Sequence, residues 1–466
     1  MTLLAVPLVA MALVAVSLGT AQSTRVAPGG EASRLAPVSA AAPPVRLAPD
    51  PPAEVLERLP VSRAALELPV YTSDVLEASA DEFAQSGGRL FETVEVTNQS
   101  PLIQGPLRVE YTLDAELTRE VFDVLRRGRV ALGHVILMDP ATGRVLSYAS
   151  TDVEAFPPTR VYPAASLVKV ITAAAALEID RETAELPCRF VGSPYRLTQS
   201  RIDPPKNGRT VSLRRALATS NNQCFAQLAV HAIGRPSLVS AIESFGWLSS
   251  PAPAHPPGEV EESEDRYELG RLGCGLGGCR ITPLHAAQLA TILAHGERIA
   301  PRWVERITDV HGRELPLPAT AAPRRVMSTE LAAEMREMLV DTTRRGTARS
   351  AFRTRRGNPR LGEVQVAGKT GSLSGRNPEG RYEWFVGVAP AEEPRIAIAV
   401  VMVQSDLWWR TASQIAGDVL DRVFCKKREC REEYVQRFIG DSPEGLGVGA
   451  PPVVPAKLAV QSESAR

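Results

Sequence analysis

The sequence predicts an α/β protein of the α+β type, with one antiparallel sheet built from both ends of its main domain. Strand-like alternation of apolar and polar residues occurs early, within residues 107–149, and returns late, within residues 363–403. The stretch between them is rich in helical patterns, and further helical patterns accompany the strands at each end. We therefore expect a sheet flanked by helices, with an all-helical subdomain inserted in the middle.

The early elements follow in a simple order. Apolar and polar side chains alternate over residues 107–114, which predicts a half-buried strand. A helix should follow and stop at Gly128, because glycine commonly ends a helix. A hairpin should come next, with strands at 134–138 and 144–149 joined by a turn through Asp-Pro-Ala-Thr-Gly.

The middle and late elements are read from the same patterns. Residues 249–265 are rich in proline and acidic residues, and we interpret them as a surface insertion. Thr282 as N-cap and Pro283 at the first helical position mark one helix start. We expect helices at 213–218, 224–232 and 283–294, late strands at 363–367, 382–388 and 395–403, and a final helix at 410–424.

The two ends of the chain differ in composition from the centre. Residues 3–18 are almost continuously apolar, and Gly19-Thr20-Ala21 suits signal cleavage. A cleaved signal peptide and an uncleaved anchor both fit, and either places the rest of the chain outside the cytoplasm. The expected organisation is a signal peptide or anchor at 1–21, a Pro/Ala-rich linker at 22–60, a small N-terminal region at 61–107 with one strand at 90–97, the main domain at 108–430, and a mostly mobile tail at 431–466.

Charge and cysteine usage limit the partners. The formal net charge is zero and no polybasic run stands out, which argues against nucleic acid. Six cysteines in an exported chain permit disulfides, and the close pairs Cys274/Cys279 and Cys425/Cys430 are the first candidates. Buried free thiols are the next alternative. A four-cysteine zinc site is disfavoured, because the gaps lie at the edge of zinc-ligand spacing and no histidine flanks them.

One predicted buried helix carries a charge. Residues 167–177 are apolar on nearly every side and rich in alanine, yet Lys169 lies in the first turn, and Ser166 lies one turn earlier on the same face. Burial lowers the pKa of an amine, so Lys169 could take the proton of the Ser166 hydroxyl and make it a nucleophile. The simpler interpretation is an N-cap serine and a lysine that reaches the surface.

Composition favours the catalytic interpretation. The chain has 53 Lys and Arg but only six Lys, so arginine serves almost everywhere as the surface cation. Arginine cannot be deprotonated, so a retained lysine is a candidate for proton transfer or for a compact ammonium. Two of the six, Lys169 and Lys369, lie in motifs.

Two further motifs have a structural and a functional interpretation. Ser220-Asn221-Asn222 lies in a break between helices, where such residues usually act as caps. Functionally, the Ser220 hydroxyl would relay a proton near Lys169, and the Asn222 amide would hold a peptide group. The second motif, Lys-Thr-Gly-Ser, we expect at the end of a strand. It is either a turn or a substrate site in which Lys369 and the Thr370 hydroxyl hold a carboxylate, Gly371 admits the substrate backbone and the Ser372 N–H is an oxyanion donor.

The three motifs together resemble those of penicillin-binding proteins and serine β-lactamases. Chance predicts ~0.4 Ser-x-x-Lys, ~0.4 Ser-x-Asn and ~0.03 Lys-Thr-Gly in such a chain, so the ordered set is specific. The spacing looks more like a penicillin-binding transpeptidase domain than a compact β-lactamase. Neighbouring phrases agree: Ile-Thr-Pro-Leu at 281–284, Gly-Thr-Ala at 346–348 and Trp-Phe-Val-Gly at 384–387.

This resemblance implies a β-lactamase/transpeptidase-like fold and a peptidoglycan D,D-transpeptidase. Ser166 would attack a D-Ala-D-Ala bond and form an acyl-enzyme, which a neighbouring stem peptide or water resolves, and penicillins would acylate the same serine. No cofactor and no metal is implied. The implied partners are peptidoglycan stem peptides, β-lactam antibiotics and other cell-wall synthesis proteins, with membrane contact only through the N-terminal segment. The implied location is the periplasm.

Other functions use the same motifs. A D,D-carboxypeptidase would transfer the acyl group to water, and a non-catalytic penicillin sensor would be acylated without turnover. A class A β-lactamase needs a glutamate that activates water, and Arg-Tyr-Glu-Leu at 266–269 faintly resembles its loop. Asn222 argues against class D. Residues 22–105 are too few for a glycosyltransferase domain or a large pedestal, so we expect a stripped transpeptidase.

Overall fold

The structure is a computed structural model that describes residues 89–94, 106–317, 320–404, 410–427 and 429–439. The expected signal peptide or anchor, the linker and the chain after residue 439 lie outside the described residues. Among the described residues, no helix combines the length and the apolar composition needed to cross a membrane.

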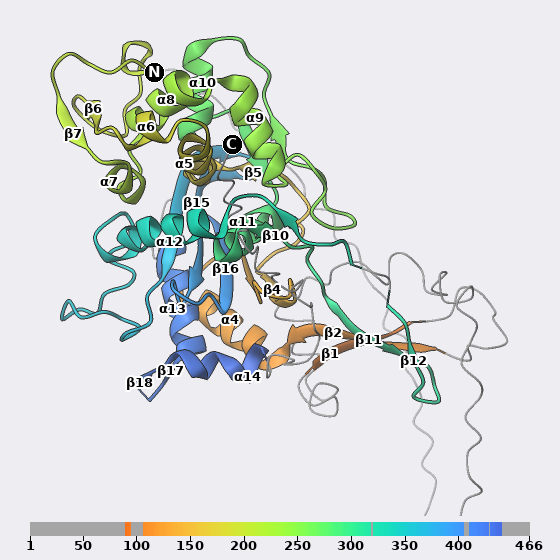
Figure 1. Ribbon diagram of the computed structural model, residues 1–466. Coiled ribbons are helices and arrows are strands. Elements are labelled where there is room, and N and C mark those ends of the chain that lie inside the picture. Colours follow the sequence, from red (N-terminus) through yellow and green to blue (C-terminus); the bar gives the residue numbers. More distant parts are fainter. Residues whose placement is uncertain (1–88, 95–105, 318–319, 405–409, 428, 440–466) are drawn as a thin grey trace, which may run out of the picture. The chain divides into compact units, whose positions relative to one another are not determined.

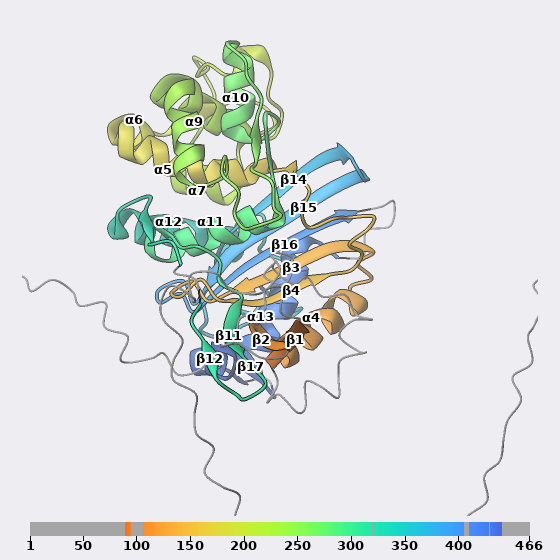
Figure 2. The same cartoon turned by 90° about the vertical axis from the view of Figure 1, so that its right-hand side faces the viewer.

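Five antiparallel strands form the main sheet, and they come from both ends of the described chain (Figure 2). The late strand β16 pairs with the early strand β3, which confirms the predicted sheet. In spatial order the strands are β14 (Ala367–Arg376), β15 (Glu379–Ala389), β16 (Ile396–Gln404), β3 (Leu132–Met138) and β4 (Val145–Ser150).

Helices cover both faces of this sheet (Figure 1), so its central strands are apolar on both sides. On β3, Ile136 and Met138 pack into one core, whereas Val135 and Leu137 pack into the other. The core that contains Ile136 lies under α11 (Pro283–His295) and α12 (Thr329–Arg344). The core that contains Val135 lies under α4 (Ala115–Arg127) and α13 (Ala412–Phe424).

The inserted part is mostly helical, with α5 (Val168–Ile179) at its centre. Its residues 168–177 are all buried, Lys169 included, as the apolar pattern predicts. The remaining helices are η2 (Ala165–Leu167), α6 (Arg181–Glu185), η3 (Gln199–Arg201), α7 (Leu213–Ala218), α8 (Asn222–Leu228), the π-helix η4 (Ala229–Ile233), α9 (Arg235–Ser244) and α10 (Arg266–Cys274).

The prediction of an all-helical insertion is wrong in detail, because short strands brace it. β6 pairs with β7, and β9 lies between β5 and β8. Residues 249–265 are also more than a surface insertion, since His255 is buried and the segment supplies β8. The strands are β5 (Tyr162–Pro163), β6 (Cys188–Phe190), β7 (Arg209–Val211), β8 (Glu259–Val260) and β9 (Cys279–Ile281).

A second sheet, which the sequence patterns did not predict, contains the strand at 107–114. That strand is β2, and it pairs with a segment almost two hundred residues later. Alternation identifies a strand but says nothing of a partner so distant. The sheet order is β1 (Arg89–Val94), β2 (Leu107–Asp114), β11 (Val304–Thr308) and β12 (Glu314–Leu315), and a separate pair consists of β10 (Glu297–Arg298) and β13 (Arg324–Arg325).

Two predicted boundaries are corrected. Residues 363–366 are not a strand, because Val364 and Val366 pack into the core from an irregular segment, and β14 begins only at Ala367. The packed region also extends past residue 430. The hairpin β17 (Cys425–Lys426) and β18 (Glu429–Cys430) leads into η5 (Glu432–Val435) and α14 (Gln436–Ile439), which bury Val435 and Phe438 against α13.

The disulfide prediction is half right. Cys425 and Cys430 are bonded, and α13 ends at the residue before Cys425 as that pair requires. Cys274 and Cys279 are free and buried. The second disulfide joins Cys188 to Cys224, across the helical part of the fold.

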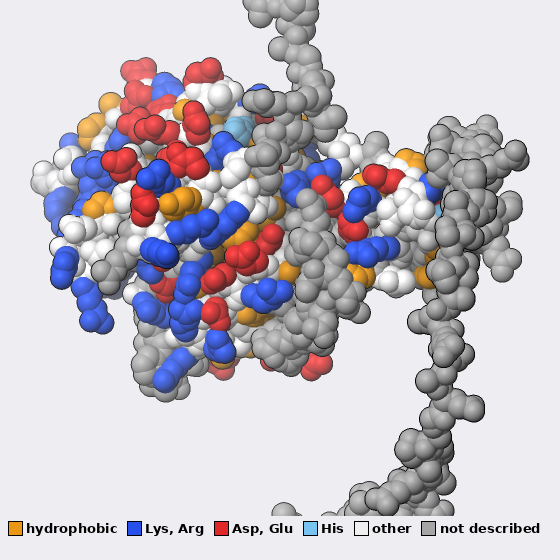
Figure 3. All heavy atoms as spheres, turned by 90° about the horizontal axis from the view of Figure 1, so that it is seen from below, with side chains coloured by type: hydrophobic (Ala, Val, Ile, Leu, Met, Phe, Trp, Pro, Cys, Tyr) orange, Lys and Arg blue, Asp and Glu red, His pale blue; other side chains and the backbone are white. Residues whose placement is uncertain are grey.

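Lys and Arg side chains lie among Asp and Glu on the face drawn in Figure 3, in keeping with the zero net charge.

Candidate active site

Ser166 lies in a turn that is held from both sides. The preceding strand β5 pairs with β9, and Trp384 Nε1 donates to the carbonyl of Pro163 at 2.9 Å. Ala165 has φ of 51°, a left-handed conformation that costs a non-glycine residue roughly 1–2 kcal/mol. Such strain persists only where the surroundings determine it, and here it sets Ser166 within η2, two residues before α5 begins.

Lys169 lies within hydrogen-bonding distance of three oxygens. Its Nζ atom is 2.8 Å from Ser166 Oγ and 2.7 Å from Asn222 Oδ1, and it also donates to the carbonyl of Cys274. The amide and backbone carbonyl oxygens can only accept, so they take two N–H groups. In the neutral amine the lone pair is then left for the Ser166 O–H, which donates to Nζ. The contacts therefore orient Lys169 as a base.

The charge state of Lys169 is compatible with this role. The side chain is fully buried, and burial lowers its pKa to about 8, although the nearby Cys274 thiol acts in the opposite direction. A substantial fraction of the amine is therefore neutral near pH 7 to 8.

The middle of the three motifs, Ser220-Asn221-Asn222, connects α7 to the first residue of α8, on the helical side of the site. Ser220 has φ of 55°, a second strained position. The Asn222 Nδ2 group donates to the carbonyl of Tyr195 at 2.7 Å, which fixes the amide with its oxygen toward Lys169. The oxygen of Asn222 is thus bonded to the lysine, and one N–H of its Nδ2 group is not used by these two bonds.

Lys369 enters the same site from β14. Its Nζ atom donates to Ser220 Oγ at 3.0 Å and to the carbonyl of Thr370 at 2.7 Å. Complete burial lowers the pKa of Lys369, and the charge of Lys169 lowers it further. A carboxylate bound beside Lys369 would favour its ammonium form, because an opposite charge raises the pKa of an amine.

The Lys-Thr-Gly-Ser motif lies near the start of β14 and not at the end of a strand, contrary to our expectation. Within the described strands β14 is the edge of the main sheet, so one side of its backbone can pair with an extended peptide. A Cβ atom on Gly371 would lie 3.3 Å from Ala165 Cβ and 3.4 Å from Ser166 N. This close approach brings the backbone near Ser372 to the nucleophile.

Two further residues, Thr347 and Arg381, belong to the site but were not predicted from the sequence. Thr347 Oγ1 lies 2.5 Å from Thr370 Oγ1, and Arg381 Nε donates to Ser372 Oγ at 2.5 Å. In the sequence, Gly-Thr-Ala at 346–348 points to Thr347 only through its resemblance to the family. Arg381 faces Ser374 across the β14–β15 ladder, a register that the sequence does not show.

A cleft of about 420 Å³ joins these groups. Of the eight predicted site residues, six line it, and the remaining two, Lys169 and Lys369, are buried behind Ser166 and Ser220. The structure thus brings all eight together. Glu268, the residue considered for water activation, forms an ion pair with Arg271 at 2.9 Å. None of its contacts among the described residues joins it to Ser166 or Lys169.

The fold and the site define a serine acyl-transferring enzyme in which a buried lysine lies beside the serine. The model of the penicillin binding protein transpeptidase domain family matches residues 133–424, which is more than half of the chain. The chain therefore belongs to that family.

Known proteins agree with this assignment. The chain is 28% identical over 341 residues to the peptidoglycan D,D-transpeptidase PbpA of Mycobacterium tuberculosis, covering 63% of this chain and 67% of PbpA. It is 26% identical over 346 residues to the peptidoglycan D,D-transpeptidase FtsI of Escherichia coli, covering 68% and 54%. Among solved structures, the penicillin G acyl-enzyme complex of M. tuberculosis penicillin-binding protein A matches with a TM-score of 0.54 and 26% identity, covering 67% of this chain and 80% of that one.

Proposed function

We propose that the protein is a peptidoglycan D,D-transpeptidase that cross-links stem peptides through an acyl-enzyme on Ser166 and that penicillin acylates the same serine. The observation that carries this proposal is the position of Lys169 Nζ, 2.8 Å from Ser166 Oγ, with the second lysine, Lys369, bonded to Ser220 behind the same cleft. Family membership and the two D,D-transpeptidase relatives support it.

Acylation begins with proton transfer. Ser166 Oγ attacks the carbonyl carbon of the bond between the last two D-Ala residues, and its proton moves to Nζ of Lys169. The N–H groups of Ser166 and Ser372 stabilise the oxyanion that develops on the carbonyl oxygen. The C–N bond then breaks, and the leaving amine takes a proton from Lys169, directly or through the Ser220 hydroxyl, so that D-Ala leaves with a neutral amine.

Deacylation repeats these steps with a new nucleophile. An amine of a neighbouring stem peptide gives up a proton to the neutral Lys169 and attacks the ester carbonyl. The new C–N bond is the cross-link, the ester bond to Ser166 Oγ breaks, and Lys169 returns the proton to that oxygen. Attack by water instead gives carboxypeptidase products.

Lys369 and Thr370 would hold the terminal carboxylate of the donor. The hydroxyl of Thr370 is paired with that of Thr347, and Nζ of Lys369 donates to the carbonyl of Thr370. A bound carboxylate would favour the ammonium form of Lys369. Charge-assisted hydrogen bonds of this kind are roughly twice as strong as neutral ones. This contact would also place the ring carboxylate of penicillin, so the antibiotic and the donor peptide compete for one site.

A labelled penicillin tests the proposal. We expect a stable covalent adduct, seen as a mass increase on the peptide that contains Ser166, in the native enzyme but not in Ser166→Ala. With a stem pentapeptide and an acceptor amine, the enzyme should then release D-Ala and form the cross-linked dimer. No adduct in a folded protein would contradict the proposal.

The other interpretations give different results in the same assays. D-Ala release without dimer indicates a carboxypeptidase, and rapid loss of the label indicates a β-lactamase. A lasting adduct with no reaction on peptides indicates a penicillin sensor.

The proposal includes an extracytoplasmic location, with residues 1–21 as signal peptide or anchor and a main domain that begins at residue 108 and extends past residue 430 to include α14. Mass analysis of the mature N-terminus would show whether cleavage follows Ala21. Protease treatment of cells with a permeabilised outer envelope should digest the protein, whereas a cytoplasmic marker stays intact.

A further inference from the structure

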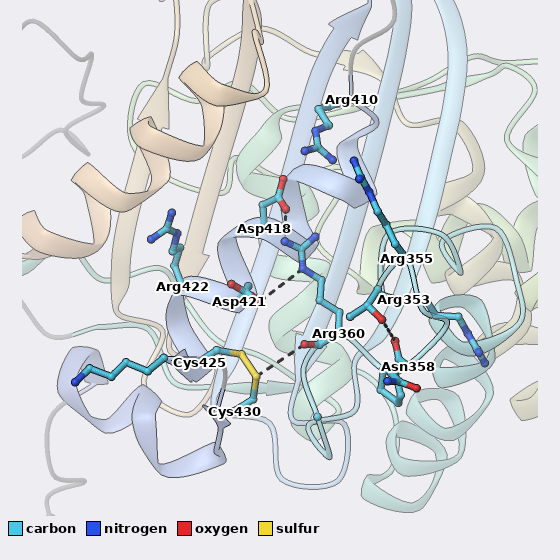
Figure 4. Close-up of a pocket in the computed structure, with 14 residues that line it drawn as sticks. Arg353, Arg355, Asn358, Arg360, Arg410, Asp418, Asp421, Arg422, Cys425 and Cys430 are labelled. Carbon is cyan, nitrogen blue, oxygen red and sulfur yellow. Dashed lines mark hydrogen bonds and ion pairs between the residues drawn. A yellow bond between two sulfur atoms is a disulfide. The ribbon is translucent and has the colours of Figure 1, made fainter.

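A second and larger cleft lies on the far side of α13 from the main sheet, bounded by the segment 353–362 and the β17–β18 hairpin (Figure 4). Its volume is about 820 Å³. Thr411 to Ser413, at the start of α13, line the active-site cleft, whereas the second cleft is lined by Arg410 and by residues one to four turns further along the helix. The two clefts share no lining residue.

Positive charge dominates the second cleft. Six cationic side chains line it, but only two carboxylates do: Arg353, Arg355, Arg360, Arg410, Arg422 and Lys427 against Asp418 and Asp421. This excess is local, because the chain as a whole has zero net charge.

Both carboxylates are already engaged. Arg360 forms an ion pair with Asp418 and lies 3.7 Å from Asp421 through Nε. Arg422 has a different acidic partner, Glu120, at 3.4 Å. These contacts neutralise the floor of the cleft, which Arg360, Arg422 and the two aspartates form. The rim, formed by Arg353, Arg355 and Arg410, stays positive.

The rim arginines have no acidic partner among the residues that the structure describes. Arg355 and Arg410 are exposed, and no ion pair within the described chain involves either of them. Arg353 donates from Nη1 to the carbonyl of Gly357 at 2.9 Å and from Nη2 to that of Arg344 at 3.4 Å, so its guanidinium is held in place while its charge stays uncompensated. Like charges around one hollow repel one another, and a bound anion would relieve this repulsion.

The frame that carries these cations is braced. Arg353 bridges to Pro359 at the base of its loop, and the Arg360 ion pairs tie that loop to α13. The Cys425–Cys430 disulfide closes the hairpin on the opposite wall. Because the walls are fixed before binding, a ligand need not order them, which favours affinity.

We propose that this cleft binds a phosphate group carried on a larger molecule. The planar guanidinium presents paired N–H donors that match phosphate oxygens, and two such groups compensate the charge of one phosphate. A hollow of about 820 Å³ exceeds the needs of a bare ion, so it has room for the molecule that bears the phosphate. This phosphate site is independent of the proposed reaction at Ser166.

Two probes separate the sources of such a phosphate. Pyrophosphate, measured by calorimetry on the full chain, represents a soluble phosphate ester. Vesicles that contain phosphatidylglycerol, compared by flotation with vesicles of phosphatidylcholine alone, represent a lipid headgroup.

The test variant is Arg355→Ala/Arg410→Ala. The matched control is Arg181→Ala/Arg214→Ala, which removes the same charge from two exposed ion pairs elsewhere. We expect the test pair to lower the affinity for at least one probe tenfold or more, and the control pair to change it less than twofold. Penicillin acylation of Ser166 should be unchanged in both and reports folding independently.

The pattern of results decides between the outcomes. Loss confined to pyrophosphate supports a soluble ester, and loss confined to anionic vesicles supports a lipid headgroup. Binding of neither probe by the native chain, or equal loss in both variant pairs, would overturn the proposal. If the alanine pair fails to fold, Arg355→Lys/Arg410→Lys keeps the charge without the paired donors and should weaken the same probe about threefold.

Discussion

Oδ1 of Asn222 lies 2.7 Å from Nζ of Lys169 and accepts a hydrogen bond from it. The sequence predicts that the Asn222 amide holds the substrate, but its oxygen is already bonded to Lys169, the proposed base. The Tyr195 carbonyl fixes the other end of the same amide. The middle motif therefore orients the lysine before any substrate arrives.

Asn222→Asp tests this role. The new carboxylate would favour the ammonium form and raise the pKa of Lys169, so penicillin acylation at pH 7 should fall about tenfold to a hundredfold. Raising the pH should recover most of the lost rate. The measurement is the second-order acylation rate between pH 6 and 10, and a loss that is equal at every pH would show that Asn222 does not act through the base.

The native enzyme should itself show the titration of Lys169. The active form is the neutral amine and the pKa of Lys169 is about 8, so the acylation rate should rise with pH below 8 and level off above it. Lys169→Arg should remove the reaction throughout, because a guanidinium does not lose its proton. A rate that is flat from pH 6 to 9 would contradict a lysine base with this pKa.

Lys369 should matter only to ligands that carry a carboxylate. Lys369→Gln removes the ammonium but keeps a hydrogen-bonding side chain, and we expect benzylpenicillin to acylate it about 10 to 100 times more slowly. The methyl ester of benzylpenicillin, which lacks the charge, serves as the matched ligand and should lose less than threefold. Equal losses for acid and ester would assign Lys369 to proton transfer through Ser220 and not to carboxylate binding.

Local patterns carried much of the prediction. The bounds of β2 and α7 match the alternation and helical runs at 107–114 and 213–218, because short-range periodicity decides both. The motif residues were recognised because each motif is contiguous in the sequence. Periodicity cannot predict which segments or cysteines pair when they lie far apart in the sequence.

The misses share that cause. Cys188 bonds to Cys224 across 36 residues, whereas spacing alone favoured the neighbours Cys274 and Cys279. The carbonyl of Cys274 reaches Lys169 from a helix that begins a hundred residues later, and a backbone oxygen leaves no sequence signal at all. Thr347 and Arg381 likewise join the site through tertiary contacts.

Removal of one or the other disulfide should affect the stability of the fold and the rate of acylation differently. Loop-closure entropy predicts a loss of ~3.5–4 kcal/mol without Cys188–Cys224 but only ~2 kcal/mol without Cys425–Cys430, which closes a separation of five residues. Because Cys224 lies two residues after Asn222, Cys188→Ala should also slow acylation, whereas Cys425→Ala should not. Denaturant unfolding and acylation rates measure the two effects, and the reverse order of stabilities would argue against the Cys188–Cys224 pairing.

Gly275 should be irreplaceable because of what its backbone touches. It has φ of 69°, and a Cβ atom there would lie 2.0 Å from the carbonyl oxygen of Ala165, next to Ser166. Gly312 is the matched control, since its φ of 76° imposes the same left-handed strain but a Cβ atom added there would meet no atom within 4 Å. Gly312→Ala should cost only roughly 1–2 kcal/mol of unfolding free energy and leave acylation intact.

Gly275→Ala must displace either Ala165 or the Cys274 carbonyl that orients Lys169, so it should lower the acylation rate at least tenfold and destabilise the fold more than the control. Equal effects of the two substitutions would show that backbone strain, and not the contact with Ala165, is what glycine relieves at this position.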